Sequence, residues 1–314
     1  MPAILQVHNL VKKYGEFAAV KGISFDIQEG EIFSLLGPNG AGKTTTISVL
    51  STLYAPTSGD AVVGGHSVVK EPMAVRRLIG VVPQDLAIYD ELSARENLSF
   101  WGQMYGLSGK ALKTRIDEVL EQIGLSERAN SRVKTFSGGM KRRVNIGVGL
   151  LHKPRLLFMD EPTVGIDPQS RRAILDSVKD LNRQGMTVLY TTHYMEEAQE
   201  LSDRVGIIDH GELIALGTQK ELTRQVGEND TLVLGTGEGE DGTALAEAVR
   251  AVPGVLRAEA TDHAITIIAP EAEEVLAPVI TRANEMGIKV RSVAIQEPNL
   301  EAVFLHLTGR ALRD

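Results

Sequence analysis

The sequence predicts an α/β protein in two parts: a doubly wound core over residues 1–225 and a small α+β domain over residues 226–314. Two observations predict this. Short apolar segments, of which Arg155–Met159 is apolar throughout after its arginine, have the character of strands buried in a parallel sheet, and helical segments separate them. That alternation is typical of doubly wound folds. From residue 231 the expected order becomes strand, helix, strand, strand, helix, strand, which is the ferredoxin-like pattern.

Glycines and turn residues separate the expected elements along the chain. In the first part, strands are expected over residues 4–8, 23–27, 31–36, 62–63, 79–84, 155–159, 187–191 and 205–209, with a turn at 56–60. Helices are expected over residues 44–53, within 94–150 with breaks near 106–109 and 124, and over 171–184 and 195–201. Beyond a boundary near Val226–Asp230, strands are expected over 231–234, 255–260, 264–269 and 289–295, with helices over 243–251, 271–286 and 299–307.

The composition excludes several classes of protein. The net charge of −8 argues against nucleic acid as a partner, since such binders normally carry a basic face. The basic cluster Lys141–Arg143 is more simply a solvated helix face. With no cysteine, the chain has no disulfide framework and no cysteine-based metal site. No apolar run approaches the roughly 18 residues that span a bilayer. If the chain acts at a membrane, we therefore expect it to do so from outside the bilayer.

The stretch GPNGAGKT, from Gly37 to Thr44, lies between an apolar strand and a helix and fits the phosphate-loop pattern GxxxxGK(S/T). Its glycines let the backbone approach a ligand, so that N–H groups point at an anion with a helix dipole behind them. Lys43 would reach the β- and γ-phosphates, and Thr44 would place its hydroxyl on Mg²⁺. The alternative is an ordinary glycine-rich turn. The residues expected at the nucleotide are Gly37, Pro38, Asn39, Gly40, Ala41, Gly42, Lys43, Thr44 and Thr45.

Two carboxylates, Asp160 and Glu161, directly follow the apolar strand that ends at Met159. A strand that ends in this way places them at the carboxyl-terminal edge of the sheet, where ligands bind in open α/β folds. Asp160 would hold Mg²⁺ alongside Thr44, and Glu161 would polarise the attacking water as general base. A solvated acidic strand end is common by itself, but next to a phosphate loop the pair indicates nucleotide hydrolysis.

The segment Ser137–Gly139 is expected to begin another helix, which continues into the basic cluster. A helix N-terminus favours an anion, although a serine N-cap followed by glycines is the simpler explanation. One nucleotide does not need two separate helix ends of this kind. The mismatch suggests a second subunit whose nucleotide this segment would touch.

Three further residues are weaker candidates. His193 follows the strand at 187–191 and could donate to a γ-phosphate, although an isolated histidine is more often a surface or core residue. Gln84, at the end of its strand, could contact Mg²⁺ or the water, or could be a polar loop residue. Tyr14 could stack on a base or pack in the core.

In this order and spacing, GPNGAGKT, Gln84, FSGGM, LLFMDEP, Gly165-Ile-Asp167 and His193 resemble the ATP-binding-cassette (ABC) ATPases over about residues 3–220. The resemblance implies a P-loop NTPase cassette with an antiparallel β subdomain and a helical subdomain, using ATP and Mg²⁺. It implies that Tyr14 stacks on adenine and that Ser137, Gly138 and Gly139 bind the γ-phosphate of the partner subunit's ATP. Asp167 would lie in the loop that crosses the dimer seam. Gln84 would couple to the membrane subunit, and His193 would steady the transition state.

One departure from the family pattern is Met140, which stands where the signature usually has glutamine. The serine and both glycines are intact, so we expect the ATP site to be retained.

A finer resemblance links the chain to exporter ATPases of the daunorubicin-resistance type, whose C-terminal domain ends in a segment like Glu297–Gly309. It implies an ATP-hydrolysing subunit, peripheral on the cytoplasmic side of the cell membrane, that powers efflux of drugs or lipid-like substrates through separate permease subunits. Two copies, most simply identical, would pair around two ATP molecules. The alternatives are a soluble ABC ATPase, an importer ATPase, or an exporter of sodium, polysaccharide or peptide.

Within the tail, Leu300, Val303, Phe304 and Leu307 recur at helical spacing. This apolar stripe either packs on its own small domain, or braces two ATPase subunits or keeps the complex closed between turnovers.

Overall fold

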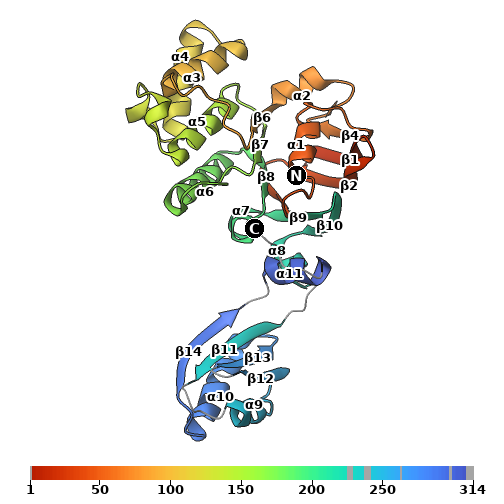
Figure 1. The fold of residues 1–314 in the computed structure, drawn as a ribbon, viewed down its shortest axis with the longest axis vertical. Coiled ribbons are helices and arrows are strands. Elements are labelled where there is room, and N and C mark those ends of the chain that lie inside the picture. Colours follow the sequence, from red (N-terminus) through yellow and green to blue (C-terminus); the bar gives the residue numbers. More distant parts are fainter. Residues whose placement is uncertain (1, 225–228, 237–241, 262–263, 297–298, 309–314) are drawn as a thin grey trace. The chain divides into compact units, whose positions relative to one another are not determined.

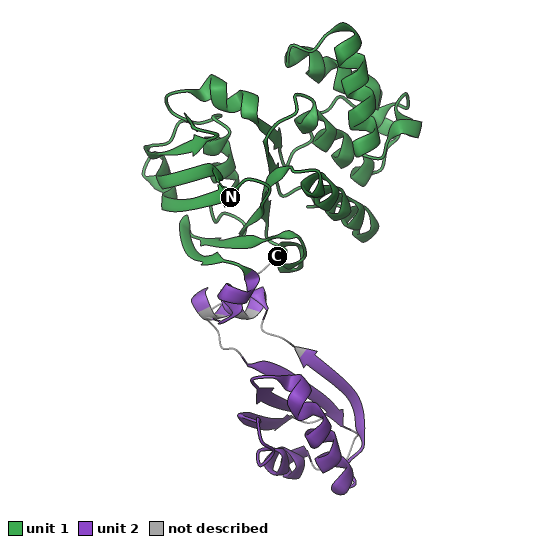
Figure 2. Cartoon of the chain, turned by 180° about the vertical axis from the view of Figure 1, so that it is seen from behind, with its two compact units in different colours: residues 1–218, 312–314 green, residues 219–311 purple. Residues whose placement is uncertain are grey.

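The computed structural model describes residues 2–224, 229–236, 242–261, 264–296 and 299–308. The chain forms two compact units, residues 1–218 with 312–314 and residues 219–311 (Figure 2). The division falls ahead of the predicted boundary at 225–226. Helix α8 (Gln219–Thr223) is grouped with the second unit, where it packs against α11 (Leu300–Thr308).

A six-stranded sheet forms the centre of the first unit, in the order β10-β9-β3-β8-β7-β6 (Figure 1). Its strands are β3 (Ile32–Leu36), β6 (Ile79–Val82), β7 (Leu156–Asp160), β8 (Thr187–Thr192), β9 (Arg204–Asp209) and β10 (Glu212–Gly217). All neighbours pair in parallel except β10 with β9. β3, β7 and β8 are buried at every position, which explains their continuous apolar character. The predicted doubly wound core is confirmed, with α1 (Lys43–Leu50), α6 (Pro168–Arg183) and α7 (Met195–Leu201) among its helices.

A second, antiparallel sheet has the order β2-β1-β4-β5 and gives the antiparallel β subdomain that the resemblance implied. Its strands are β1 (Ala3–Tyr14), β2 (Phe17–Gln28), β4 (Ser58–Val63) and β5 (His66–Ser67). The predicted strands were too short, because register shifts along β1 interrupt the alternation of apolar residues and Asn9 has a φ of 45°. The turn predicted at 56–60 was wrong at its end, where β4 begins. Helix α2 (Pro72–Leu78) was missed because it buries only Val75 and so has no apolar stripe.

The helical lobe contains α3 (Ala94–Met104), α4 (Gly109–Gln122) and α5 (Gly138–Leu150), with short 3-10 turns at Ser126–Arg128 and Val133–Thr135. The predicted breaks are confirmed. Gly106 and Gly124 follow the ends of α3 and α4 with φ of 84° and 64°, the left-handed conformation that commonly terminates a helix.

The second unit contains a four-stranded antiparallel sheet in the order β12-β13-β11-β14. Its elements are β11 (Asp230–Thr236), α9 (Gly242–Val249), β12 (Arg257–Thr261), β13 (Ala264–Ala269), α10 (Ala272–Glu285), β14 (Val290–Gln296) and α11. Alternate residues of β11 and β13 share a core with α9 and α10, so both helices lie on one face of the sheet. Leu300, Val303 and Phe304 of the tail are buried, on the helix that packs against α8. Glu297, Pro298 and Gly309 lie outside the described residues.

Candidate functional site

The loop of residues 37–42 joins β3 to α1 at the carboxyl-terminal edge of the six-stranded sheet. Two of its glycines have no room for a side chain. A Cβ on Gly37 would lie 2.1 Å from the carbonyl oxygen of Ile208, and one on Gly42 would lie 2.5 Å from that of Ala19. Gly42 occupies the N-cap position of α1 with a φ of 107°, and no side chain accepts a capping hydrogen bond there. The first N–H groups of α1 are therefore left for another acceptor, which is how helix ends bind phosphate.

Lys43, the first residue of α1, is buried, with 4% of its surface exposed. Its Nζ donates to the carbonyl oxygens of Gly37 at 2.6 Å and Pro38 at 2.9 Å. It also forms an ion pair of 2.9 Å with Oε1 of Glu161. The ammonium group thus lies between the loop and the acidic end of β7.

Asp160, the last residue of β7, is almost fully buried. Its carboxylate accepts hydrogen bonds from the hydroxyls of Thr191, at 2.7 Å, and Thr44. Burial raises the pKa of Asp160 above its ordinary value, while the two hydrogen bonds oppose that rise. A carboxylate beside a threonine hydroxyl supplies the hard oxygen ligands that Mg²⁺ prefers. Among the described residues, no group of three or more His, Cys, Asp or Glu could hold a metal, so this pair would need phosphate and water to complete the coordination.

Glu161 has a φ of 43°, a left-handed conformation that residues other than glycine rarely adopt. Hydrogen bonds hold it there: its N–H donates to the carbonyl oxygen of Thr191 at 3.2 Å and to its Oγ1 at 3.0 Å. Its Oε2 lies 3.2 Å from Nδ1 of His193, and both side chains are buried. Strain of this kind clusters at functional sites, where the surrounding structure maintains it.

A cavity of 330 Å³ opens beside these groups. It is lined by Tyr14, Phe17, Ala19, Asn39, Gly40, Gly42, Lys43, Thr44, Thr45, Gln84 and Glu161. The structure therefore brings together the phosphate loop, Gln84, the end of β7 and the tyrosine at the end of β1. Sequence reasoning missed Phe17 and Ala19, which reach the cavity from β2; the aromatic Phe17 so close to Tyr14 was the only signal. Tyr14 is 45% exposed and has the ammonium of Lys12 5.2 Å from its ring centre.

None of Ser137, Gly138, Gly139 and Asp167 lines this cavity. Ser137 caps α5 by accepting a hydrogen bond of 3.3 Å from the N–H of Met140, and it is exposed together with Gly138. Gly139 is buried against α6, where a Cβ would lie 2.3 Å from the Ser170 side chain.

Asp167 caps α6. The hydrogen bond of 2.9 Å from the N–H of Ser170 lowers the pKa of this exposed carboxylate. The two capping residues, Ser137 and Asp167, thus begin two helices that are in contact.

The backbone beside Gln84 is held by α5. Arg142 donates to the carbonyl oxygens of Pro83 at 2.8 Å and Gln84 at 2.7 Å, and Asn145 adds a bond of 3.2 Å to Pro83. Arg142 is 4% exposed, and burial lowers its pKa. The interpretation of the basic cluster as a solvated face was therefore wrong for this residue. It links the helix that begins at Ser137 to the loop at the cavity wall.

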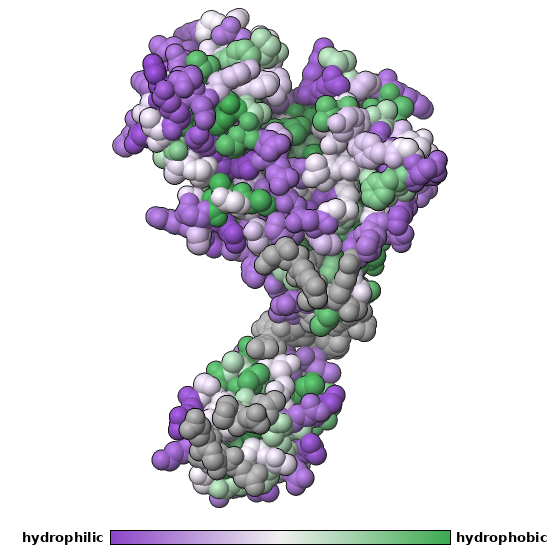
Figure 3. All heavy atoms as spheres, viewed as in Figure 1, coloured by the Kyte–Doolittle hydropathy of each residue, from purple (hydrophilic) through white to green (hydrophobic). Residues whose placement is uncertain are grey.

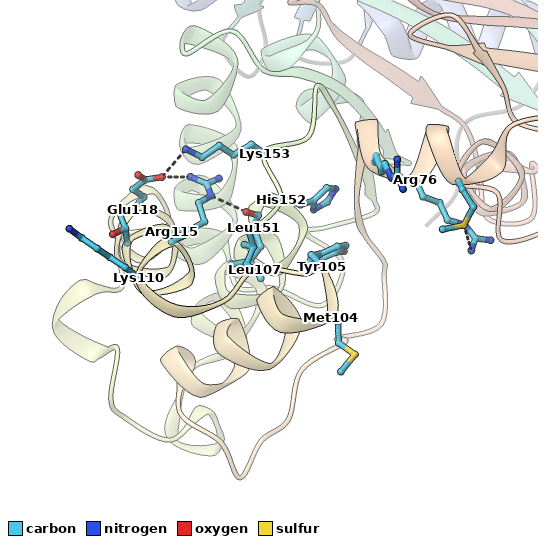
Figure 4. Close-up of a pocket in the computed structure, with 14 residues that line it drawn as sticks. Arg76, Met104, Tyr105, Leu107, Lys110, Arg115, Glu118, Leu151, His152 and Lys153 are labelled. Carbon is cyan, nitrogen blue, oxygen red and sulfur yellow. Dashed lines mark hydrogen bonds and ion pairs between the residues drawn. The ribbon is translucent and has the colours of Figure 1, made fainter.

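A larger groove of 1110 Å³ lies among α2, α3, α4 and the end of α5 (Figure 4). Its apolar lining includes Met73, Met104, Tyr105, Leu107 and Leu151, and its basic residues are Arg76, Arg77, Lys110, Arg115 and Lys153. In the space-filling view, apolar side chains gather in the hollow between the lobe of α3 and α4 and the lobe of α2 (Figure 3).

Two residues of the groove hold elements that lead to the cavity. Arg115 donates to the carbonyl oxygens of Leu150 at 2.6 Å and Leu151 at 3.0 Å, where α5 ends. His152 hydrogen-bonds through Nε2 to the carbonyl oxygen of Ile79, at 2.7 Å, where β6 begins. Groove and cavity are therefore joined through both α5 and β6. Across the described ranges, no helix has the length and apolar character that a membrane span requires.

Comparison with known proteins identifies the family. Residues 20–164 match the family "ABC transporter". The chain is 51% identical to the linearmycin resistance ATP-binding protein LnrL of Bacillus subtilis, over 99% of this chain and 100% of that protein. The chain is an ABC transporter ATPase. This ATPase is also 41% identical to the doxorubicin resistance ATP-binding protein DrrA of Mycobacterium tuberculosis, over 96% of this chain and 92% of that protein.

Two solved structures resemble the cassette. An ATP-binding subunit of an ABC transporter shares 32% identity with a TM-score of 0.64, over 71% of this chain and 93% of that one. A dimeric ATP-binding cassette in a post-hydrolysis state, bound to ADP and Pi, shares 29% identity with a TM-score of 0.61, over 68% and 98%. The ABC ATPase predicted from the motifs is thus confirmed, and with it the drug-resistance exporter type.

Proposed function

We propose that this ATPase powers the export of drugs or lipid-like hydrophobic compounds through separate membrane subunits. The observation that carries the catalytic part is the cavity that joins the phosphate loop, Gln84 and Glu161, with Glu161 hydrogen-bonded to His193. The exporter part is supported by relatives named for resistance to linearmycin and doxorubicin, and by the Nod factor export ATP-binding protein I of Ralstonia nicotianae, which is 36% identical over 99% of this chain and 95% of that protein.

ATP would occupy the cavity, with its phosphates on the loop from Gly37 to Thr45 and its base against Tyr14. Thr44, Asp160 and Gln84 would hold Mg²⁺, which would neutralise charge on the phosphates. The hydrogen bond between Thr44 and Asp160 supports this assignment, because it brings the two oxygen ligands to one place.

Glu161 would act as general base, and His193 would orient it and contact the γ-phosphate. Lys43 Nζ pairs with Oε1 of Glu161, and a phosphate in the loop would compete for the same ammonium. Nucleotide binding would therefore release the carboxylate of Glu161 to accept a proton from water.

A second copy of the chain would complete the site. Ser137, Gly138 and Asp167 are exposed and line no part of the cavity, which suits residues that contact a nucleotide held by a partner. The similar cassette solved as a dimer supports this arrangement.

The membrane subunits would dock at the 1110 Å³ groove, on the cytoplasmic side of the membrane. Met73 and Met104, which are 60% and 66% exposed, are suited to a partner that covers them. A displacement of this groove by the membrane subunits would be transmitted to Gln84 through the hydrogen bonds of Arg142 and Asn145. It would be transmitted to Ser137 through α5 itself.

We further propose that residues 226–314 form a ferredoxin-like accessory domain. Its βαββαβ order and its antiparallel sheet β12-β13-β11-β14 support the assignment.

Glu161→Gln tests the catalytic proposal. Removing the base should lower ATP hydrolysis about 100-fold or more, while ATP affinity stays within about twofold and an ATP-bound dimer accumulates. Glu196→Gln, an exposed site that undergoes the same chemical change, is the control and should hydrolyse ATP normally. Normal turnover by Glu161→Gln would show that Glu161 is not the base.

A further inference from the structure

A buried carboxylate joins the turn after β7 to strand β8. Glu197, on α7, is 2% exposed and lines no part of the cavity. Its Oε1 accepts a hydrogen bond of 2.7 Å from the hydroxyl of Thr163, in the turn after β7. Its Oε2 accepts bonds of 2.9 Å from the hydroxyls of Tyr190 and Thr192, both on β8. One side chain therefore connects the segment that begins at Glu161 with the strand that ends beside His193.

The direction of these bonds restricts the backbone beyond them. A hydroxyl has one proton to donate, and Thr192 gives its proton to Glu197. Oγ1 of Thr192 is then free to accept, and it does so from the N–H of Tyr194 at 2.9 Å. His193 thus lies between Thr192 and Tyr194, whose positions depend on the carboxylate of Glu197.

Helix α6 joins the same network. Nε of Arg171 lies 3.7 Å from Oε1 of Glu197, and its guanidinium carbon lies 4.3 Å from the ring centre of Tyr194. Because α6 begins at Asp167, the carboxylate connects this helix as well to the turn after β7.

We propose that Glu197 is a positioning residue for ATP hydrolysis. It fixes the positions of Glu161 and His193 relative to each other without touching the nucleotide. The inference rests on the proposed role of Glu161. Burying a carboxylate is costly unless its hydrogen bonds are all made, and here three hydroxyls and a guanidinium surround it. A neutral amide fills the same volume but presents N–H groups where the hydroxyls now donate, so it reverses at least one bond.

Glu197→Gln in the full chain tests the inference, with Glu196→Gln on the exposed face of the same helix as the matched control. We expect kcat for ATP hydrolysis to fall about 10- to 100-fold, because small displacements of catalytic groups are that costly. KM and the Kd for ATP, measured by calorimetry, should stay within about twofold. The binding stoichiometry should equal that of the parent chain, whereas a general loss of folding would lower it. Thr192→Val, which removes one hydroxyl at constant volume, should show a smaller fall in kcat, again without a change in KM or Kd.

A double variant distinguishes positioning from an independent effect. In the Glu161→Gln background, Glu197→Gln should cause a smaller further loss of kcat than it causes in the parent chain, because one of the two groups that it positions is gone. The inference would be overturned by any of three outcomes. These are an unchanged kcat in Glu197→Gln, a loss of ATP affinity that parallels the loss of kcat, and a fully additive loss of kcat in the double variant. If Glu197→Gln does not fold, the same criteria apply to Thr192→Val. Normal turnover by Glu161→Gln would defeat the proposed function itself, whereas normal turnover by Glu197→Gln beside an inactive Glu161→Gln would defeat only this inference.

Discussion

The N-termini of α1 and α5 have the same phosphate-binding potential but contrasting surroundings. At α1, Gly42 leaves the first N–H groups without a side-chain cap, and Lys43 is buried between loop carbonyls and Glu161 in the wall of a cavity. At α5, Ser137 caps its own helix, is exposed, and borders no part of that cavity.

The difference agrees with our proposal that one chain carries two unlike halves of a site. The α1 half has its cavity, its cation and its carboxylates already assembled. The α5 half has an exposed helix end, with Asp167 capping the neighbouring helix α6. Arg142 of α5 also holds the loop of Gln84. A ligand bound at the exposed half would therefore affect the position of this loop in the enclosed half of the same chain.

The largest expected effect comes from breaking the enclosed half. Lys43→Ala should lower ATP affinity or turnover by roughly 10- to 100-fold, because a hydrogen bond to a charged group contributes about 1.5–3 kcal/mol. Calorimetry and steady-state kinetics measure the two quantities. Lys113→Ala, an exposed lysine on α4, is the control and should behave as the parent chain does. Unchanged affinity together with unchanged turnover would remove Lys43 from the site.

Breaking the exposed half should leave the enclosed half intact. Ser137→Arg should preserve ATP binding by the monomer but abolish ATP-driven dimerisation, because the larger cation blocks the helix end. Loss of the cap should cost about 1 kcal/mol of folding free energy. Size-exclusion chromatography with and without ATP measures the dimer, and Ser108→Arg, at the exposed N-cap of α4, should still dimerise. A normal ATP-bound dimer of Ser137→Arg would contradict the two-chain site.

Burial of Asp160 in the enclosed half should also lower the free energy of unfolding of the nucleotide-free chain. Burial raises the pKa of Asp160, so its charged form is disfavoured in the folded state. The penalty is absent below the ordinary pKa of an aspartate and is complete once the pH exceeds the raised value. The Tm of nucleotide-free Asp160→Asn, relative to that of the parent chain, should therefore rise as the pH increases through the range in which Asp160 ionises, while Mg²⁺-dependent hydrolysis is lowered. A difference in Tm that is independent of pH would rule out this cause.

The smallest effect is expected at Met140, the departure from the family signature. Its half-buried side chain packs against the hydrophobic cluster of the helical lobe. Met140→Gln should cost about 1 kcal/mol of folding free energy and change turnover by less than about threefold. A larger change in turnover, with dimerisation altered in parallel, would show that residue 140 takes part in the exposed half.

The parts of the molecule that the sequence predicts well are those with strong local signals. The buried strands β3, β7 and β8 are nearly continuous apolar runs, and the glycines of the phosphate loop belong to a pattern that Lys43 and Thr44 complete. The long β1 and β2 were underestimated because irregular pairing breaks their alternation. Thr191, Arg142 and Glu197 carry no signal of their own: only the fold shows that they hold Asp160, the Gln84 loop and the hydroxyls of β8.

The central claim, that each working site is built from two chains, is tested most directly by mixing Lys43→Ala with Ser137→Arg. Each variant alone should be nearly inactive. A mixed dimer contains one site with an intact Lys43 from one chain and an intact Ser137 from the other, so an equimolar mixture titrated at constant total protein should regain ATPase activity and form an ATP-dependent dimer. A mixture as inactive as the separate variants, or a Ser137→Arg chain that hydrolyses ATP normally as a monomer, would contradict the account.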